Sequence, residues 1–259
     1  MEIPLYQVDA FSSRVFAGNP AAVCPLQEWL PNDVMQSIAM ENNLAETAFF
    51  VPEGDGFRLR WFTPEVEVDL CGHATLASAY VLMTQMQTQL TAVSFHTRSG
   101  ELRVNRHGDQ YAMDFPSRPP QRLEVTREMT EALGAEPLEL WAARDYLAVF
   151  DSEPAVRALR PDMPRIAALN KFAVIVTAPG DYVDFVSRFF APAQGVPEDP
   201  VTGSAHCTLI PYWANRLNKI IMEARQVSRR GGEIHCELIR DRVCIVGQAA
   251  MFAIGRISI

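Results

Sequence analysis

The sequence predicts an α+β protein of two similar domains, each a curled, mostly antiparallel sheet or barrel around one central buried helix. The first observation behind this prediction is a phrase that occurs twice, and the second is the uncharged helix that follows it each time. The phrase reads RWFTPEVEVDLCGHATLASAY from Arg60 to Tyr80 and RFFAPAQGVPEDPVTGSAHCTLIP from Arg188 to Pro211. Self-similarity of this kind indicates a duplicated domain.

The two copies align with a single insertion. Arg60 falls on Arg188 at an offset of 128 (188 minus 60), whereas Gly72 falls on Gly203 at an offset of 131 (203 minus 72). The second copy therefore carries three extra residues (131 minus 128), in the loop between positions 195 and 200. Each copy predicts a strand, a turn that holds acids and a glycine, and then a helix.

Both predicted helices are apolar in an unusual way. The segment after Gly72 leaves no polar face of any width, so the helix should be buried on all sides. The segment after Gly203 has no Asp, Glu, Lys or Arg between Asp199 and Arg216. Pro211 lies inside this second helix and should kink it.

The remaining elements follow from shorter patterns. An apolar stripe at helical spacing predicts a surface helix over residues 32–42. Alternation of apolar and polar residues predicts half-buried strands, since side chains alternate between the two faces of a sheet. These strands lie at residues 4–10, 57–62, 102–104 and 111–115, and an apolar run at 172–176 predicts a covered strand.

A proline cluster, Ser117-Arg118-Pro119-Pro120, predicts the linker between the domains, because proline neither continues a helix nor donates to a sheet. We therefore expect an N-terminal domain over residues 1–118 and a C-terminal domain over 119–259. Whether the C-terminal strand near 251–259 returns to complete the first domain stays open.

Composition limits the partners. Of the 259 residues 48% are hydrophobic and 21% charged, and the net charge of -8 argues against nucleic acid. Five cysteines without a CxxC pair favour a reducing, cytoplasmic location, and no signal peptide or membrane span is expected. No metal site is expected either, since Cys207, His206 and His235 have no ligand spacing.

The two turns before the helices are the best candidates for ligand binding. A helix start presents unpaired backbone N–H groups and partial positive charge, so Gly72 and Gly203 could each admit an anion such as a carboxylate. The alternative for one such turn is simple N-capping, in which Thr202 or Ser204 bonds to its own helix. Two matching turns favour a binding role.

Several side chains near these turns could carry chemistry, and each has a structural alternative. Glu46 begins an apolar run, where desolvation would raise the carboxyl pKa toward the range that suits proton transfer. The alternative is an ordinary acidic residue at a strand edge. His73 either contacts a ligand or is a core histidine, and Asp199 either orients a ligand or complements the helix dipole. Cys71 precedes a helix start and is a reactive or an inert thiol. Asn19 precedes a proline and reads as a turn residue.

Longer segments resemble a known family. FAGNPAAV, NNLAETAFF, VDLCGHATLASAYVL, EDPVTGSAHCTLIPYWANRL and RRGGE closely resemble segments of the PhzF-like family, named for phenazine biosynthesis. The resemblance spans nearly the whole chain, and EDPVTGSAH is a specific motif. It implies a fold similar to diaminopimelate epimerase and proline racemase, with two pseudo-symmetric domains and an active site in the cleft between them.

The resemblance also implies residue roles and a cofactor-free reaction. In the family's namesake a glutamate moves a proton between two carbons of a cyclic amino acid, and the matching residue is Glu46. The matching histidine is His73. Asp199 and Ser204 match residues thought to hold the amino and carboxylate groups of the substrate.

Further implied binding residues are Asn19 and the glycines 72 and 203, which match backbone donors at the helix starts. One departure from the epimerase relatives concerns the thiols. Those enzymes place a cysteine before the glycine in both halves, whereas this chain has Cys71 and Thr202. A two-thiol mechanism is therefore not expected.

The sequence thus predicts a cofactor-independent isomerase that moves a proton on a small amino or hydroxy carboxylate, with Glu46 as general acid/base. An amino-acid racemase or epimerase that uses Cys71 is one alternative. A non-catalytic ligand-binding protein that retains the fold is another. A homodimer is left open, neither nucleic acid nor a membrane is an expected partner, and the substrate's identity lies beyond the sequence.

Overall fold

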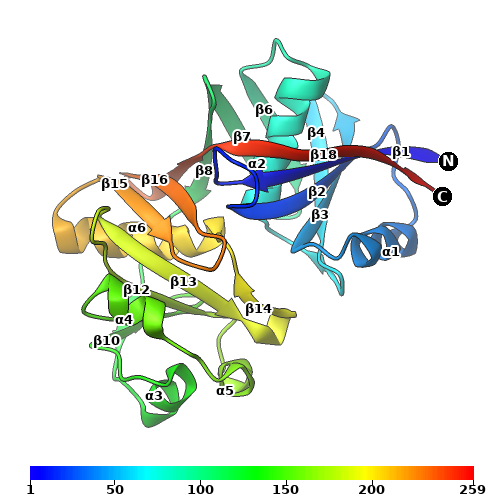
Figure 1. Ribbon diagram of the computed structural model, residues 1–259. Coiled ribbons are helices and arrows are strands. Elements are labelled where there is room, and N and C mark those ends of the chain that lie inside the picture. The colour runs from blue at the N-terminus through cyan, green and yellow to red at the C-terminus, as the bar shows by residue number, and fades with distance from the viewer. The chain divides into compact units, whose positions relative to one another are not determined.

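The computed structural model describes all 259 residues, which form two compact units (Figure 1). The first unit comprises residues 1–114 and 246–259, and the second comprises 115–245. None of the helices combines the length and the apolar character that a bilayer crossing requires.

The first unit contains two α-helices, one π-helical turn and nine strands. Their bounds are β1 (Glu2–Ala10), β2 (Asn19–Pro25), α1 (Asn32–Asn42), β3 (Glu46–Glu53), β4 (Gly56–Phe62), β5 (Glu67–Val68), α2 (Gly72–Val81), η1 (Leu82–Met86), β6 (Ala92–Thr97), β7 (Gly100–His107), β8 (Gln110–Pro116) and β18 (Ala249–Ser258).

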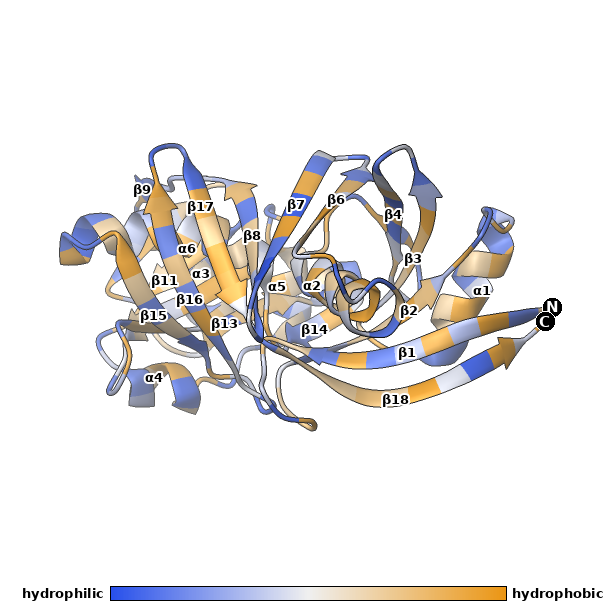
Figure 2. Ribbon diagram, turned by 90° about the horizontal axis from the view of Figure 1, so that it is seen from above, coloured by the Kyte–Doolittle hydropathy of each residue, from blue (hydrophilic) through white to orange (hydrophobic).

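The strands of this unit wrap around α2, as Figure 2 shows. The ladder runs β18-β1-β2-β3-β4-β6-β7-β8, with the pairs β2/β3 and β4/β6 parallel and the others antiparallel. Helix α2 contacts β1, β2, β3 and β18. All its residues except Tyr80 are buried, as expected for a helix without a polar face.

The C-terminal strand belongs to this first unit. β18 pairs antiparallel with β1 from Glu2↔Ser258 to Ala10↔Ala249, with a register shift between Gln7 and Val8. The first and last strands of the chain therefore lie side by side (Figure 1).

The second unit contains four α-helices, one 3-10 turn and nine strands. Their bounds are β9 (Gln121–Leu123), α3 (Arg127–Leu133), β10 (Glu139–Ala142), β11 (Tyr146–Val149), α4 (Glu153–Ala158), α5 (Met163–Ala168), β12 (Val174–Pro179), β13 (Phe185–Ala191), η2 (Pro192–Gln194), β14 (Val196–Asp199), α6 (Gly203–Leu217), β15 (Ile221–Gln226), β16 (Gly232–Ile239) and β17 (Arg242–Gly247).

Strand pairing repeats between the units. In the second unit the ladder β9-β10-β11-β12-β13-β15-β16 has parallel pairs at β11/β12 and β13/β15 and antiparallel pairs elsewhere. This is the same alternation as β18-β1-β2-β3-β4-β6-β7. Moreover, β14 and α6 connect β13 to β15 just as β5 and α2 connect β4 to β6. The phrase that occurs twice in the sequence therefore occupies the same place in each ladder.

Helix α6 continues through Pro211 without interruption. Proline has no N–H to donate, so the carbonyl of Cys207 loses its usual helical partner four residues on. The backbone N–H of Arg118 donates to that carbonyl instead, at 2.8 Å. The predicted linker segment thus satisfies the group that the proline leaves open.

Candidate active site

One half of the candidate site lies where two neighbouring strands of the first unit begin. Asn19 is the first residue of β2 and Glu46 the first of β3, and these strands are parallel with Ala21 opposite Glu46. The starts of parallel strands meet at one edge of a sheet. His73, the second residue of α2, lies at the same place, because its ring contacts both Asn19 and Glu46.

The imidazole of His73 has a different neighbour at each nitrogen. Nε2 lies 3.1 Å from Oε2 of Glu46, at ion-pair distance although not in line for a hydrogen bond. Nδ1 lies 3.1 Å from Nδ2 of Asn19 and 3.5 Å from Sγ of Cys71. The side chains of His73 and Glu46 are only 4% and 15% exposed, so water competes little for these contacts.

Burial acts on the two other titratable groups of this cluster. It raises the pKa of Cys71 to about 11, assisted by the negative charge of Glu46 and opposed by His73. For His73 burial by itself lowers the pKa, but the charges of Cys71 and Glu46 raise it above its usual value. At neutral pH Cys71 is a neutral thiol, so its upward effect on the pKa of His73, which is the larger of the two, is absent there. Only the carboxylate of Glu46 then opposes burial, which is the strongest single influence and favours a neutral ring.

Glu46, Cys71 and His73 each offer an atom that could bind a metal, and these atoms all lie within 4.8 Å of one another. However, Glu46 contacts Nε2 of the ring and Cys71 contacts Nδ1. The pKa of Cys71 is about 11, so at neutral pH this thiol would have to lose its proton before it could bind an ion. The cluster suits proton exchange among side chains better than binding of a single metal ion.

Neither of the two buried helices is capped by a side chain. Cys71 is the N-cap of α2 and Thr202 that of α6, and neither makes a side-chain capping bond. The alternative interpretation, in which Thr202 caps its own helix, is therefore wrong. Both helix starts, at Gly72 and Gly203, keep the backbone character that favours anions.

In the second unit, the turn before α6 is held by Gln226 at the end of β15. The Gln226 side chain accepts from the N–H of Thr202 at 2.9 Å and donates to the carbonyl of Asp199 at 2.7 Å. The hydroxyl of Thr202 donates to Oδ2 of Asp199 at 2.5 Å. Gln226 is fully buried, so these bonds fix the turn that carries Asp199.

Ser204 is held by a second polar group. Its Oγ accepts from Nη2 of Arg144 at 3.2 Å, and the same guanidinium binds Asp145 through both carboxylate oxygens. The Asp145 side chain is only 1% exposed, whereas that of Arg144 is 29% exposed, so the carboxylate is buried and the guanidinium still reaches water. Arg144 also lies over the ring of Phe172, 4.4 Å from its centroid.

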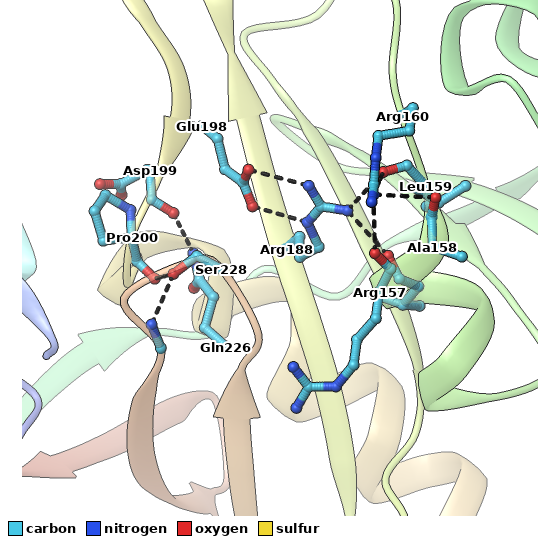
Figure 3. A network of polar contacts seen from close by, with 12 residues as sticks. Arg157, Ala158, Leu159, Arg160, Arg188, Glu198, Asp199, Pro200, Gln226 and Ser228 are labelled. Atoms are coloured by element: carbon cyan, nitrogen blue, oxygen red, sulfur yellow. Dashed lines mark hydrogen bonds and ion pairs between the residues drawn. The ribbon is translucent and has the colours of Figure 1, made fainter.

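The duplicated phrase also carries a duplicated ion pair. Arg60 donates to both oxygens of Glu67 at 2.7 and 2.8 Å, and Arg188 donates to both oxygens of Glu198 at 2.8 and 3.0 Å. Figure 3 shows the second pair, in which Arg188 also reaches the carbonyls of residues 156 and 159. Each pair ties a strand to the segment that leads into a buried helix.

Comparison with known proteins identifies the family. The family model described as phenazine biosynthesis-like protein (PhzC-PhzF) matches residues 8–255. A Pseudomonas aeruginosa protein named an uncharacterized isomerase is 54% identical over 260 residues, with 100% of both chains covered. The chain belongs to the phenazine biosynthesis-like PhzC-PhzF family.

Solved structures support the same assignment. A PhzF family protein from Enterococcus faecalis matches with a TM-score of 0.98 and 49% identity, covering 100% of both chains. A probable proline racemase from Agrobacterium radiobacter matches in fold alone, with a TM-score of 0.69 and 11% identity over 99% of this chain and 93% of that one. The predicted α+β, diaminopimelate epimerase-like fold is confirmed, and the isomerase class agrees with the names of the relatives.

Within this PhzF-like fold, the predicted residues form two groups. Asn19, Glu46, Cys71 and His73 make one cluster in the first unit, together with Gly72 at the helix start. Asp199, Gly203 and Ser204 lie on one turn and helix start of the second unit. Sequence reasoning missed the residues that support the second group, which are Arg144, Asp145 and Gln226. No motif marks these three, since the contacts of Arg144 with Ser204 and of Gln226 with Thr202 join positions that are 60 and 24 residues apart in the sequence.

Proposed function

We propose that this protein is an isomerase that moves a proton on a small amino or hydroxy carboxylate, with Glu46 as general acid/base and no cofactor. The observation that supports this most is the 3.1 Å contact between Oε2 of Glu46 and Nε2 of His73, in side chains that are 15% and 4% exposed. A positioned carboxylate with little access to water can accept a proton from an activated carbon and return it elsewhere. His73 provides the partner that orients it.

The backbone around Gly72 supplies the second requirement. A carboxylate group of the substrate would be held at the start of α2, where unpaired N–H groups and the helix dipole favour an anion. Binding there would place the substrate next to the Glu46–His73 pair, because His73 directly follows Gly72. Proximity of a bound carbon acid to a fixed base accounts for much of the rate that such an enzyme needs.

Asp199, Gly203 and Ser204 are proposed as further substrate-binding groups. Support comes from the bonds that fix them, since Thr202 and Gln226 hold Asp199 and Arg144 holds Ser204. Asp199 would bind the substrate's amino group by its charge. Asp199→Asn should therefore raise KM more for amino than for hydroxy carboxylates, and equal effects on both would contradict this role.

The main test follows turnover by NMR with a panel of unsaturated 2-amino and 2-hydroxy carboxylates. Glu46→Gln keeps the size of the side chain but removes the base, so we expect kcat to fall by about 100-fold or more. Product formation must be measured together with deuterium uptake from D₂O, because one carboxylate can shuttle the same proton. Undiminished turnover by the variant would contradict the proposal.

A racemase that uses Cys71 is the second candidate, favoured by the 3.5 Å contact between its Sγ and His73. Against it, burial raises the pKa of Cys71 to about 11, which leaves little thiolate at neutral pH. Cys71→Ala decides between the two. Loss of turnover in Cys71→Ala, with Glu46→Gln still active, would favour the racemase. If the wild type binds the candidate substrates but turns none of them over, the result would instead favour a ligand-binding protein.

A further inference from the structure

Asn19 contacts the catalytic cluster from the strand that neighbours β3. Its side chain is fully buried, and its Nδ2 lies 3.1 Å from Nδ1 of His73. An amide nitrogen is only a donor, so the ring nitrogen that faces it must act as the acceptor. A proton on Nδ1 would place two donors against each other.

The other neighbour of Nδ1 leads to the same conclusion. Sγ of Cys71 lies 3.5 Å from Nδ1, and burial raises the pKa of this thiol to about 11. At neutral pH it is therefore a neutral S–H group, which can donate to the ring nitrogen. Nε2, by contrast, faces only an acceptor, the carboxylate of Glu46 at 3.1 Å.

We propose that Asn19 is a positioning residue that keeps Nδ1 of His73 unprotonated, so that the ring is neutral and carries its proton on Nε2, the nitrogen that lies 3.1 Å from Oε2 of Glu46. Glu46 favours a second proton on the ring, and Asn19 opposes it. The Asn19 contact therefore decides the charge of the imidazole. Only the catalytic consequence of this inference rests on the proposed function.

That consequence concerns the availability of Glu46. An imidazolium beside a carboxylate forms a charge-assisted pair with it and lowers the affinity of the carboxylate for a proton. A neutral N–H group lowers this affinity less. A neutral His73 orients Glu46 and still leaves it able to accept a proton from a substrate. Asn19 thus acts on Glu46 through the histidine.

The backbone holds Asn19 closely in place. It pairs with Ala10 of β1 and precedes Pro20. Gly18 before it adopts a φ of +68°, and a Cβ there would lie 2.2 Å from the carbonyl oxygen of Ala10. Only glycine fits this approach, and the fixed turn sets where the amide of Asn19 points.

The titratable groups near His73 limit the interpretation of a test. Glu46 faces the ring from β3 and Cys71 from the start of α2. Asp9 of β1, which also packs against α2, is buried, and its Oδ2 accepts from the N–H of Phe16 at 2.8 Å. Substitutions at Asn19 leave all these charges in place.

The test is imidazole ¹⁵N NMR of the protein without substrate, in the wild type and in Asn19→Asp and Asn19→Ala. The His73 signals are assigned from their loss in His73→Gln. We expect the wild type at pH 7 to carry a proton on Nε2 and none on Nδ1. Asn19→Asp, which is nearly isosteric, should accept a hydrogen bond from a protonated Nδ1 and raise the midpoint of the His73 titration by at least one pH unit, about 1.4 kcal/mol. Asn19→Ala should raise it by less.

A protonated Nδ1 in the wild type at pH 7, or an unchanged or lowered midpoint in both variants, would overturn the proposal. The exposed His107 serves as an internal reference whose midpoint must stay constant. Backbone NMR spectra show whether each variant is folded, and Asn19→Asp remains informative if Asn19→Ala is not. Because no substrate is needed, the result stands even if Glu46→Gln retains turnover and the proposed function fails.

Discussion

At the level of single residues, the candidate site consists of buried polar side chains that contact one another. Glu46 and His73 are held side by side, and the ring nitrogen that faces the carboxylate supplies a polar neighbour in a place with little water. Cys71 is compensated less well, because its anionic form would add a second negative charge next to Glu46, and His73 only partly opposes the resulting rise of its pKa. The same environment therefore favours a carboxylate base and disfavours a thiolate.

Slow alkylation of Cys71 is the direct expectation from its pKa of about 11. At pH 7.5 the thiolate fraction should be about 300-fold smaller than that of an unperturbed cysteine with a pKa near 8.5. Mass spectrometry of the iodoacetamide-treated protein, with the Cys71→Ser variant to identify the peptide, measures the rate against that of a cysteine-containing peptide. Labelling as fast as the peptide would show an activated thiol and favour the racemase alternative.

Much of this residue list could be predicted from the sequence, because NNLAET and DLCGH are local motifs that carry Glu46 and His73. The contact of Asn19 with His73 could not be predicted. These residues are 54 positions apart, and they meet because β2 pairs with β3 and packs on α2. Gln226 was missed for the same reason, since its pattern is that of an ordinary strand end.

At the level of elements, the two Arg–Glu pairs explain why the duplicated phrase begins with arginine. Each guanidinium joins two antiparallel strands next to a buried helix, and each also lies over an aromatic ring, Phe62 for Arg60 and Phe190 for Arg188. The sequence repeat predicted the equivalence of the arginines. It did not predict their acidic partners, because the insertion of three residues hides the match of Glu67 with Glu198.

Glu198→Gln tests how much the Arg188–Glu198 ion pair contributes to stability. The side chains of Arg188 and Glu198 are 11% and 26% exposed, so removing one charge leaves the other in a partly dry place. We expect the free energy of unfolding to fall by about 2 kcal/mol, less than for a fully buried pair. The matched control is Glu233→Gln, because Glu233 forms an exposed ion pair with Arg225. This substitution should change the free energy of unfolding by less than about 0.5 kcal/mol. Equal effects in urea denaturation would contradict the argument.

Helix α6 shows a limit of predictions made from a single element. Considered alone, a proline in a helix interior leaves one backbone carbonyl of the preceding turn without its helical partner. Here the backbone of Arg118, almost a hundred residues earlier in the chain, donates to the carbonyl of Cys207 that Pro211 leaves without a partner. The compensation comes from a distant segment, so the local sequence could not reveal it.

At the level of the whole molecule, each unit surrounds one helix that lacks charged residues over most of its length. The repeat and the uncharged helices predicted this architecture because both signals are strong and independent of strand boundaries. The pairing of the last strand with the first could not be derived, since β18 begins more than 240 residues after β1 and has no local signal for its partner. The duplication, by contrast, can be recognised from the sequence alone.

A histidine on the enclosed part of a helix is expected to be neutral, because burial disfavours its charged form. His206 of α6 is fully buried, and burial lowers its pKa to about 4, although a hydrogen bond from its ring to the carbonyl of Thr202, at 2.8 Å, partly opposes this. In the unfolded chain a histidine titrates near 6.5. Between these values the unfolded state binds more protons, so the stability that depends on a neutral His206 is complete above about pH 6.5 and is lost as the pH falls toward 4.

Urea denaturation from pH 7 to pH 4, in the wild type and in His206→Gln, measures this contribution. Glutamine does not titrate and can still donate to Thr202. In the wild type the pKa of His206 differs by about 2.5 units between the unfolded and the folded state, which corresponds to about 3 kcal/mol of stability lost over that range. The free energy of unfolding of the wild type should therefore fall by about this amount relative to the variant. The fluorescence of Trp213, whose indole donates to Thr177 at 2.9 Å within the same unit, follows the relevant unfolding step. Parallel pH curves for the two proteins would show that His206 is charged or solvated in the folded state and that α6 is not enclosed as described.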